Sequence, residues 1–195
     1  MKHLKLILLT FVFIASYSCK EAKKESKEVM EDKNVMEKEM IEVVGAKTLN
    51  FTLEPKSGSS VKGDVNFSEE NGTVTMKATL VGLTPGEHAI HIHEKADCSS
   101  ADGKSTGGHW NPTFSPHGKW GSTEGYHRGD IGNFTADTDG NASVEFSTDE
   151  WCLGCNDETK NLLGKGVIVH EGIDDFITQP TGDAGGRVSC AGIIE

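Results

Sequence analysis

The stretch HAIHIHE, residues 88–94, has the pattern of a β-strand and places His91 and His93 on either side of one isoleucine. Successive side chains of an extended chain point to opposite faces, so His91 and His93 share one face, whereas the isoleucines share the other face with His88. Two imidazoles at this spacing, with Cα atoms roughly 7 Å apart, can converge on one metal ion. The same pattern also fits the ordinary polar face of a surface strand, so it does not define a metal site by itself.

The length and charge of the chain limit what it can be. With 195 residues and a formal net charge of −11, it has room for one medium-sized domain with its own core and for an additional segment. An acidic total disfavours a nucleic-acid partner, because binding to a phosphate backbone depends on a basic surface. We therefore expect no nucleic acid among its partners.

The first part of the chain has the organisation of an export signal. A positively charged start precedes an apolar run at residues 6–15, and small residues then lead to Cys19. The run is too short to span a bilayer comfortably, so we interpret residues 1–18 as a removed signal peptide and expect no membrane span in the mature protein. The box ASYSC resembles a bacterial lipoprotein processing site, which predicts a lipid on Cys19; ordinary cleavage after Ser18 is the alternative.

A charged segment follows the signal. Residues 19–46 are rich in Lys and Glu and have almost no aromatic side chains, a composition that cannot bury enough surface to fold independently. We interpret this segment as a lipidated cysteine followed by a flexible tether, which leaves residues 47–195 as the only folded domain.

The rest of the chain alternates between short strand-like runs and turn signals such as ENG, TPG and TDG. The runs lie at residues 48–55, 61–68, 73–83, 87–94, 129–137, 141–148, 164–172 and 186–194. They predict an all-β domain, an eight-stranded antiparallel Greek-key flattened barrel or sandwich. Residues 94–129 and 171–187 break the rhythm, and loops of such length in a compact domain are usually functional or cross-linked.

The histidines concentrate on these loops and on one strand face, and the cysteines suggest disulfides. Of the eight histidines, one lies in the signal and one is His88; the others are His91, His93, His109, His117, His127 and His170. A lone histidine is usually an ordinary core or surface residue, but packing does not readily explain six together. Apart from Cys19, four cysteines remain, an even number that suggests two disulfides in an exported protein; they are Cys98, Cys152, Cys155 and Cys190.

From about Thr48 to its end, the chain resembles the copper/zinc superoxide dismutases. The resemblance rests on the motifs HAIHIHE, GGHWNP, YHRGDIGNFTAD, VIVHEG and GDAGGRVSCAGII, which occur in the order of that family and at similar intervals. It implies a β-sandwich fold and an enzyme that converts superoxide, a small-molecule substrate, to oxygen and hydrogen peroxide.

The resemblance also implies two adjoining metal sites. The copper ligands would be His91, His93, His109 and His170, and the zinc ligands would be His109, His117, His127 and Asp130. His109 would bridge the two ions and take part in catalysis. The residue types agree with these metals, since imidazole nitrogens suit copper, and three imidazoles with one carboxylate suit tetrahedral zinc.

Four further residues have implied roles. Asp174 matches an aspartate that accepts hydrogen bonds from one copper and one zinc histidine, here His91 and His117, and so fixes their orientation. Arg187 matches an arginine beside the copper that receives the superoxide anion, a catalytic role. The resemblance pairs Cys98 with Cys190, which would hold this arginine near the metal loops.

Two features depart from the family pattern. In the segment DEWCLGCNDETKN, residues 149–161, Cys152 and Cys155 could form a local disulfide, a redox pair or two ligands of another metal. We favour the disulfide, because no second cysteine or histidine pair remains to complete a zinc site. The loop after residue 170 lacks lysine, so guidance of the anion would depend on Arg187 with Lys119 or Arg128, and its rate should depend only weakly on salt.

These observations predict an enzyme of the bacterial cell envelope that contacts the membrane only through an N-terminal lipid, faces the periplasm or the exterior and could form a homodimer. The alternative is an envelope lipoprotein that stores copper or zinc without turnover. A third interpretation, a scaffold sandwich, predicts eroded ligand positions. Arg187 favours the enzyme, because a metal store needs no anion-binding group.

Overall fold

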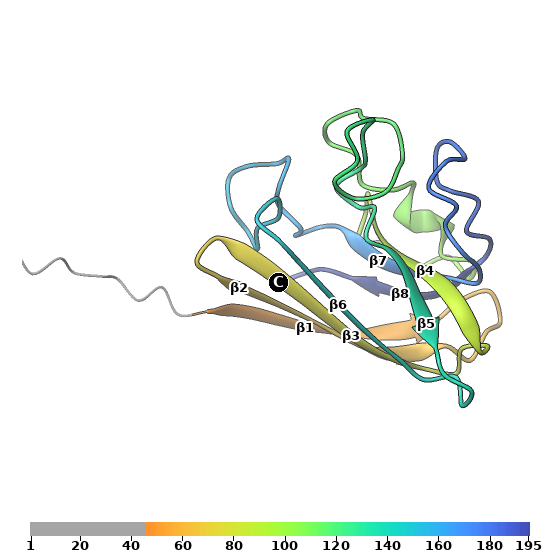
Figure 1. The fold of residues 1–195 in the computed structure, drawn as a ribbon. Helices are drawn as coiled ribbons and strands as arrows, with labels where there is room; N and C mark the ends of the chain where they lie inside the picture. The colour runs from red at the N-terminus through yellow and green to blue at the C-terminus, as the bar shows by residue number, and fades with distance from the viewer. Residues whose placement is uncertain (1–45) are drawn as a thin grey trace, which may run out of the picture. The chain divides into compact units, whose positions relative to one another are not determined.

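The computed structural model describes residues 46–195, which form eight β-strands and one short 3₁₀ turn (Figure 1). The elements are β1 (Lys47–Pro55), β2 (Lys62–Glu70), β3 (Thr73–Val81), β4 (Gly86–His93), η1 (Lys104–Thr106), β5 (Gly132–Ala136), β6 (Ala142–Thr148), β7 (Gly166–His170) and β8 (Arg187–Gly192). The predicted signal peptide, Cys19 and nearly all of the tether lie outside the described residues. Within residues 46–195, no helix is long and apolar enough to cross a membrane.

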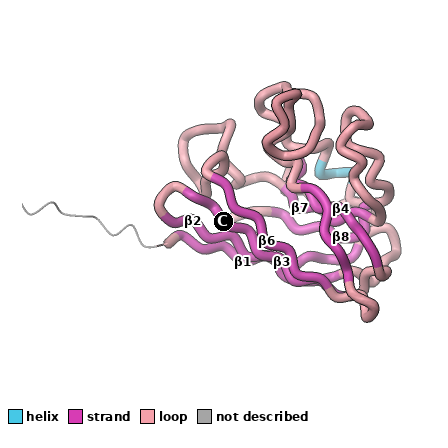
Figure 2. The backbone as a smooth tube through the Cα atoms, in the orientation of Figure 1, coloured by secondary structure: helices cyan, strands magenta, loops and turns pink. Residues whose placement is uncertain are grey.

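The strands follow the order β5-β4-β7-β8-β1-β2-β3-β6, and every neighbouring pair is antiparallel. One wall holds β1, β2, β3 and β6, and the other holds β5, β4, β7 and β8 (Figure 2). The walls join where the end of β1 pairs with β8, as at Glu54 and Cys190. The edge strands β5 and β6 contact each other, which nearly closes the barrel. The structure therefore confirms the predicted all-β fold class.

Alternation of side chains builds the core. On β3 every second residue is buried, from Val74 through Met76 and Ala78 to Leu80, and these side chains pack inside the barrel. β4 differs, because its residues from His88 to His93 are all buried. Ile90 belongs to the core, whereas the opposite face of the strand is covered by loops.

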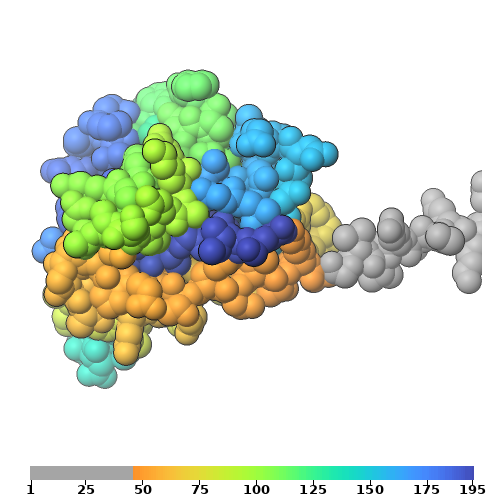
Figure 3. Space-filling view, turned by 180° about the vertical axis from the view of Figure 1, so that it is seen from behind, coloured from red at the N-terminus to blue at the C-terminus, as the bar shows by residue number. Residues whose placement is uncertain are grey.

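Two long loops, between β4 and β5 and between β7 and β8, lie side by side over one end of the barrel (Figure 1). A third irregular segment connects β6 to β7, and the sequence pattern did not single it out as a long loop. Seen from behind in Figure 3, the end of the chain (dark blue) lies between β1 (orange) and this third segment (light blue). Here Gly164 N donates to Ile193 O over 2.8 Å.

Candidate metal centre

Strand pairing gathers the histidines. His91 and His93 alternate with core residues on β4, and β7, the antiparallel neighbour of β4, ends at His170. His109 comes from the long loop but forms an isolated antiparallel bridge with His93, which fixes the loop against the strand. Three elements distant in sequence thereby present imidazoles to one place.

The copper set, as we call the four histidines His91, His93, His109 and His170, has ligand atoms within 4.8 Å of one another. His93 Nδ1 donates to Gly107 O over 3.0 Å, and His170 Nδ1 donates to Gly185 O over 3.4 Å. Each ring then carries its lone pair on Nε2, and these two nitrogens face each other at 3.4 Å. Two facing lone pairs repel each other, so the arrangement suits a shared cation.

The zinc set comprises His109, His117, His127 and Asp130, whose ligand atoms also lie within 4.8 Å of one another. The Asp130 carboxylate is oriented by the backbone, because Oδ2 accepts from His127 N over 2.7 Å and from Gly118 N over 3.2 Å. His109 belongs to both sets, with Nδ1 2.8 Å from Asp130 Oδ1. The residues predicted for copper and for zinc are therefore brought together as two adjoining groups.

Buried nitrogen atoms test whether these residues fit metal ions. Among residues 46–195, five buried side-chain nitrogens have no hydrogen-bond partner: Arg128 Nε and four imidazole nitrogens, His91 Nδ1, His109 Nε2, His117 Nδ1 and His127 Nδ1. An orphaned buried polar atom costs free energy, so native proteins rarely retain one without a ligand. All four imidazole nitrogens belong to the two sets, and the donor types, imidazole in one and imidazole with carboxylate in the other, fit copper and zinc.

Asp174 connects the two sets. Its Oδ2 accepts from His91 Nε2 and its Oδ1 from His117 Nε2, each over 2.9 Å. These bonds leave Nδ1 of both rings free to bind a metal. A Cβ atom at Gly182 would lie 1.9 Å from Asp174 Oδ1, so only glycine allows this loop to pass so close to the carboxylate.

The pKa values reflect burial and the two carboxylates. Burial, and the neighbouring His109, lower the pKa of His93, and burial lowers that of His109 to about 4, so both are neutral at pH 7. Burial also opposes the charged form of His117, but the adjacent carboxylates of Asp130 and Asp174 outweigh it and raise the pKa of His117 to about 9. Burial likewise acts to raise the pKa of Asp130, yet the three histidines around its carboxylate hold it well below its usual value.

Arg187 lies at a cleft of about 350 Å³ whose lining includes His93, His109 and His170. The structure joins Cys98 to Cys190 and Cys152 to Cys155. The first disulfide ties the loop before His109 to β8, the strand that begins at Arg187. An always-charged guanidinium is thus placed beside the copper set.

The surrounding charges differ from the expectation. Arg128 is paired with Glu150, away from the cleft, and Lys119 does not line it. The second cation of the cleft is Lys104. A signal for it was present, since Lys104 lies between Cys98 and His109, in the segment that the disulfide holds beside Arg187.

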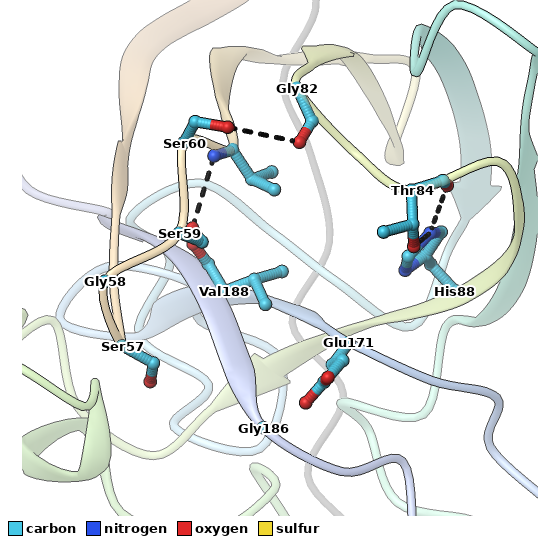
Figure 4. A pocket seen from close by; sticks show the side chains of 11 residues that line it. Ser57, Gly58, Ser59, Ser60, Gly82, Thr84, His88, Glu171, Gly186 and Val188 are labelled. Atoms are coloured by element: carbon cyan, nitrogen blue, oxygen red, sulfur yellow. Dashed lines mark hydrogen bonds between the residues drawn. The ribbon is translucent and has the colours of Figure 1, made fainter.

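His88 lies outside both metal sets, as its strand parity predicts. Its Nδ1 is 3.1 Å from the carbonyl oxygen of His170, and its Nε2 is 2.8 Å from that of Thr84. His88 lines a second cavity of about 470 Å³, whose other lining residues are largely serines, glycines and Glu171 (Figure 4). We therefore expect His88 to play no part in catalysis.

Comparisons with known proteins agree with this geometry. A family model described as copper/zinc superoxide dismutase matches residues 61–193. A double mutant of a SOD-like protein from Bacillus subtilis is 30% identical, with a TM-score of 0.67 over 75% of this chain and 97% of that chain. The unmutated SOD-like protein from Bacillus subtilis is 29% identical, with a TM-score of 0.66 over 74% and 97%. The clock protein EA4 is 31% identical, with a TM-score of 0.65 over 75% and 94%.

Proposed function

The chain belongs to the copper/zinc superoxide dismutase family, and from this premise we propose that it catalyses the dismutation of superoxide to oxygen and hydrogen peroxide. Two observations together carry the proposal. Both donor sets are complete and have His109 in common, and the guanidinium of Arg187 lies at the cleft of the copper set.

The copper set would hold copper and the zinc set would hold zinc. Bound copper would supply one-electron chemistry, by which one superoxide is oxidised to oxygen and a second is reduced, with two protons, to hydrogen peroxide. The zinc set, closed by three imidazoles and a carboxylate, would stabilise the loop that carries it.

The protein contributes charge, geometry and a proton position. Arg187 attracts the small anion and orients it at the open side of the copper set. His109 Nε2, which has no hydrogen-bond partner among residues 46–195, would hold a proton during turnover whenever it does not bind the metal. His93 and His170 keep their Nε2 atoms directed at the same point through their hydrogen bonds to Gly107 and Gly185.

Two of the structural relatives are called SOD-like, so their fold alone does not establish turnover. We propose turnover for this chain because neither donor set lacks a member and the arginine is present. A non-catalytic metal store remains the outcome to be tested against.

The test is superoxide-dismutating activity of residues 47–195 loaded with copper and zinc, beside His93→Ala and Arg187→Ala variants. We expect fast turnover that is lost in His93→Ala and reduced in Arg187→Ala. Stoichiometric binding of both metals without turnover in the unsubstituted protein would replace the enzyme with a metal store.

The two disulfides indicate a protein that matures outside the cytoplasm. We propose in addition that Cys19 carries a lipid that anchors the domain in the bacterial envelope. Metabolic labelling with a radioactive fatty acid checks this, since a Cys19→Ala variant should lose both the label and the membrane association. Equal labelling of both proteins would contradict the anchor.

A further inference from the structure

The guanidinium of Arg187 is held by two groups that belong to neither metal set. Arg187 Nη1 donates to the backbone oxygen of Gly103 over 2.9 Å and to Thr106 Oγ1 over 3.0 Å. Both protons of Nη1 are used by these two bonds. Within residues 46–195, neither Nε nor Nη2 of Arg187 has a hydrogen-bond partner, so these atoms remain available to an anion in the cleft.

The polar groups of Thr106 are hydrogen-bonded, which fixes the position of this residue. The residue is fully buried, and its hydroxyl donates to Gly103 O over 2.9 Å while it accepts from Arg187. Its own carbonyl oxygen accepts from Lys95 N over 2.9 Å. On the other side its Cγ2 methyl lies against Gly166, at 3.2 Å from the position of a Cβ atom there. The hydroxyl therefore has one orientation, and its hydrogen bond can restrict the more mobile Arg187 side chain to one orientation of the guanidinium.

The nearby disulfide does not by itself fix the guanidinium of Arg187. The disulfide between Cys98 and Cys190 brings the loop near β8, but Cys190 is three residues after Arg187 and constrains backbone only. The guanidinium is at the end of a long side chain whose rotamers the disulfide does not choose. A hydrogen bond at the guanidinium itself is needed to select one of them.

We propose that Thr106 is a positioning residue, whose hydroxyl orients the Arg187 guanidinium so that Nε and Nη2 face an anion at the copper set. This inference rests on the proposed function, because it concerns the group that would receive superoxide. It assigns Thr106 no contact with the substrate.

The experiment is a double-mutant cycle on the full chain loaded with copper and zinc. The probe is azide, a small anion, and its binding is measured at equilibrium from the copper absorption bands. Thr106→Val keeps the methyl group against Gly166 and removes the hydroxyl, Thr106→Ser keeps the hydroxyl, and Arg187→Ala removes the guanidinium. Thr148→Val is the matched control, since Thr148 is a buried threonine whose hydroxyl accepts from Glu150 N instead.

We expect Thr106→Val to weaken azide binding about three- to tenfold, as loss of one hydrogen bond to a charged group would. Thr106→Ser and Thr148→Val should bind azide as the unsubstituted protein does. In the Arg187→Ala background, Thr106→Val should have no further effect, because its action passes through the arginine.

An equal weakening by Thr106→Val with and without the arginine would overturn the inference, and so would unchanged azide affinity in Thr106→Val. The proposed function fails separately. If azide binding follows the cycle as expected but the unsubstituted protein does not dismutate superoxide, the positioning role stands and the enzymatic one falls.

Discussion

His91 and Asp174 are joined by a hydrogen bond of 2.9 Å from Nε2 to Oδ2, and both side chains are completely buried. The other carboxylate oxygen accepts from His117, so one residue orients an imidazole of each metal set. An Asp174→Asn variant keeps the shape but places an NH₂ group against one of the two donating rings. We expect its affinity for copper, zinc or both to fall by about 10- to 100-fold, measured by competition with a chromophoric chelator.

Asp175→Asn is the control for this change. Asp175 is the next residue, but its carboxylate is exposed and, within the part of the chain that the structure describes, accepts only from Ile177 and Thr178 in its own turn. It should bind both metals as tightly as the unsubstituted protein. If Asp174→Asn also bound both metals as tightly as the unsubstituted protein, the hydrogen bonds of Asp174 to the two sets would contribute nothing to metal affinity.

The two disulfides should contribute very different amounts to stability. Cys98 and Cys190 are separated by 92 residues, whereas Cys152 and Cys155 are separated by three. Loop-closure entropy predicts that replacing the first pair with serine lowers the free energy of unfolding by about 4–5 kcal/mol, and replacing the second pair by about 2 kcal/mol. Guanidinium unfolding of the metal-free protein measures both values, and similar losses for the two pairs would contradict this account.

The strands could be predicted from the sequence, since they follow from local patterns, whereas the full set of candidate metal-binding histidines was implied by the resemblance to a known family. The alternation in HAIHIHE determines which side chains share a face, and β4 retains that parity. The arrangement of charges around the cleft could not be predicted in the same way. Arg128 is near His127 in sequence, but its partner is Glu150, on a segment that only the folded barrel brings close. Long-range ion pairs leave no periodic signal in a sequence.

The burial of Trp151, in the segment after β6, also could not be predicted from the sequence. The cysteines of this segment predicted a disulfide, but its main structural contribution comes from Trp151, which is 1% exposed and packs edge-on against Phe67 with ring centroids 6.4 Å apart. Tryptophan is rarely buried completely, and no pattern of spacing marked it. The surrounding aromatic residues come from distant strands and loops, so burial could be known only from the fold.

Trp151 should therefore be a major core residue. Besides its aromatic contacts, its Nε1 donates to Arg128 O over 2.8 Å, which ties the segment between β6 and β7 to the loop that carries most of the zinc set. We expect Trp151→Ala to lower the free energy of unfolding by about 3–5 kcal/mol, as truncation of large core aromatics does. Denaturant unfolding measures the loss.

Trp120→Ala is the comparison for this variant. Trp120, Phe146 and Trp151 form an aromatic cluster, in which Trp120 packs edge-on against Trp151 with ring centroids 5.8 Å apart but is only partly buried. Its replacement should lower the free energy of unfolding clearly less than that of Trp151. A larger loss for Trp120 would mean that this cluster, and not the barrel interior, is the main source of stability at this end.

The rate of dismutation should depend weakly on salt, because the charges at the cleft nearly balance. Two cations, Lys104 and Arg187, line it together with two carboxylates, Asp102 and Asp183, and Asp102 lies 3.5 Å from Lys104. A balanced rim attracts an anion little at long range, so kcat/KM should fall less than about threefold between low and physiological ionic strength.

Removing one carboxylate from the cleft should change this balance of charge. Asp183 is exposed and has a φ of 53°, a conformation that asparagine adopts readily, so Asp183→Asn should fold normally. We expect it to raise kcat/KM about two- to threefold at low ionic strength and to make the rate more sensitive to salt. Asp157→Asn, at an exposed carboxylate that does not line the cleft, should change neither property. Pulse-radiolysis rates over a salt series measure both, and a steep loss of rate with salt in the unsubstituted protein would show that its steering field is not balanced.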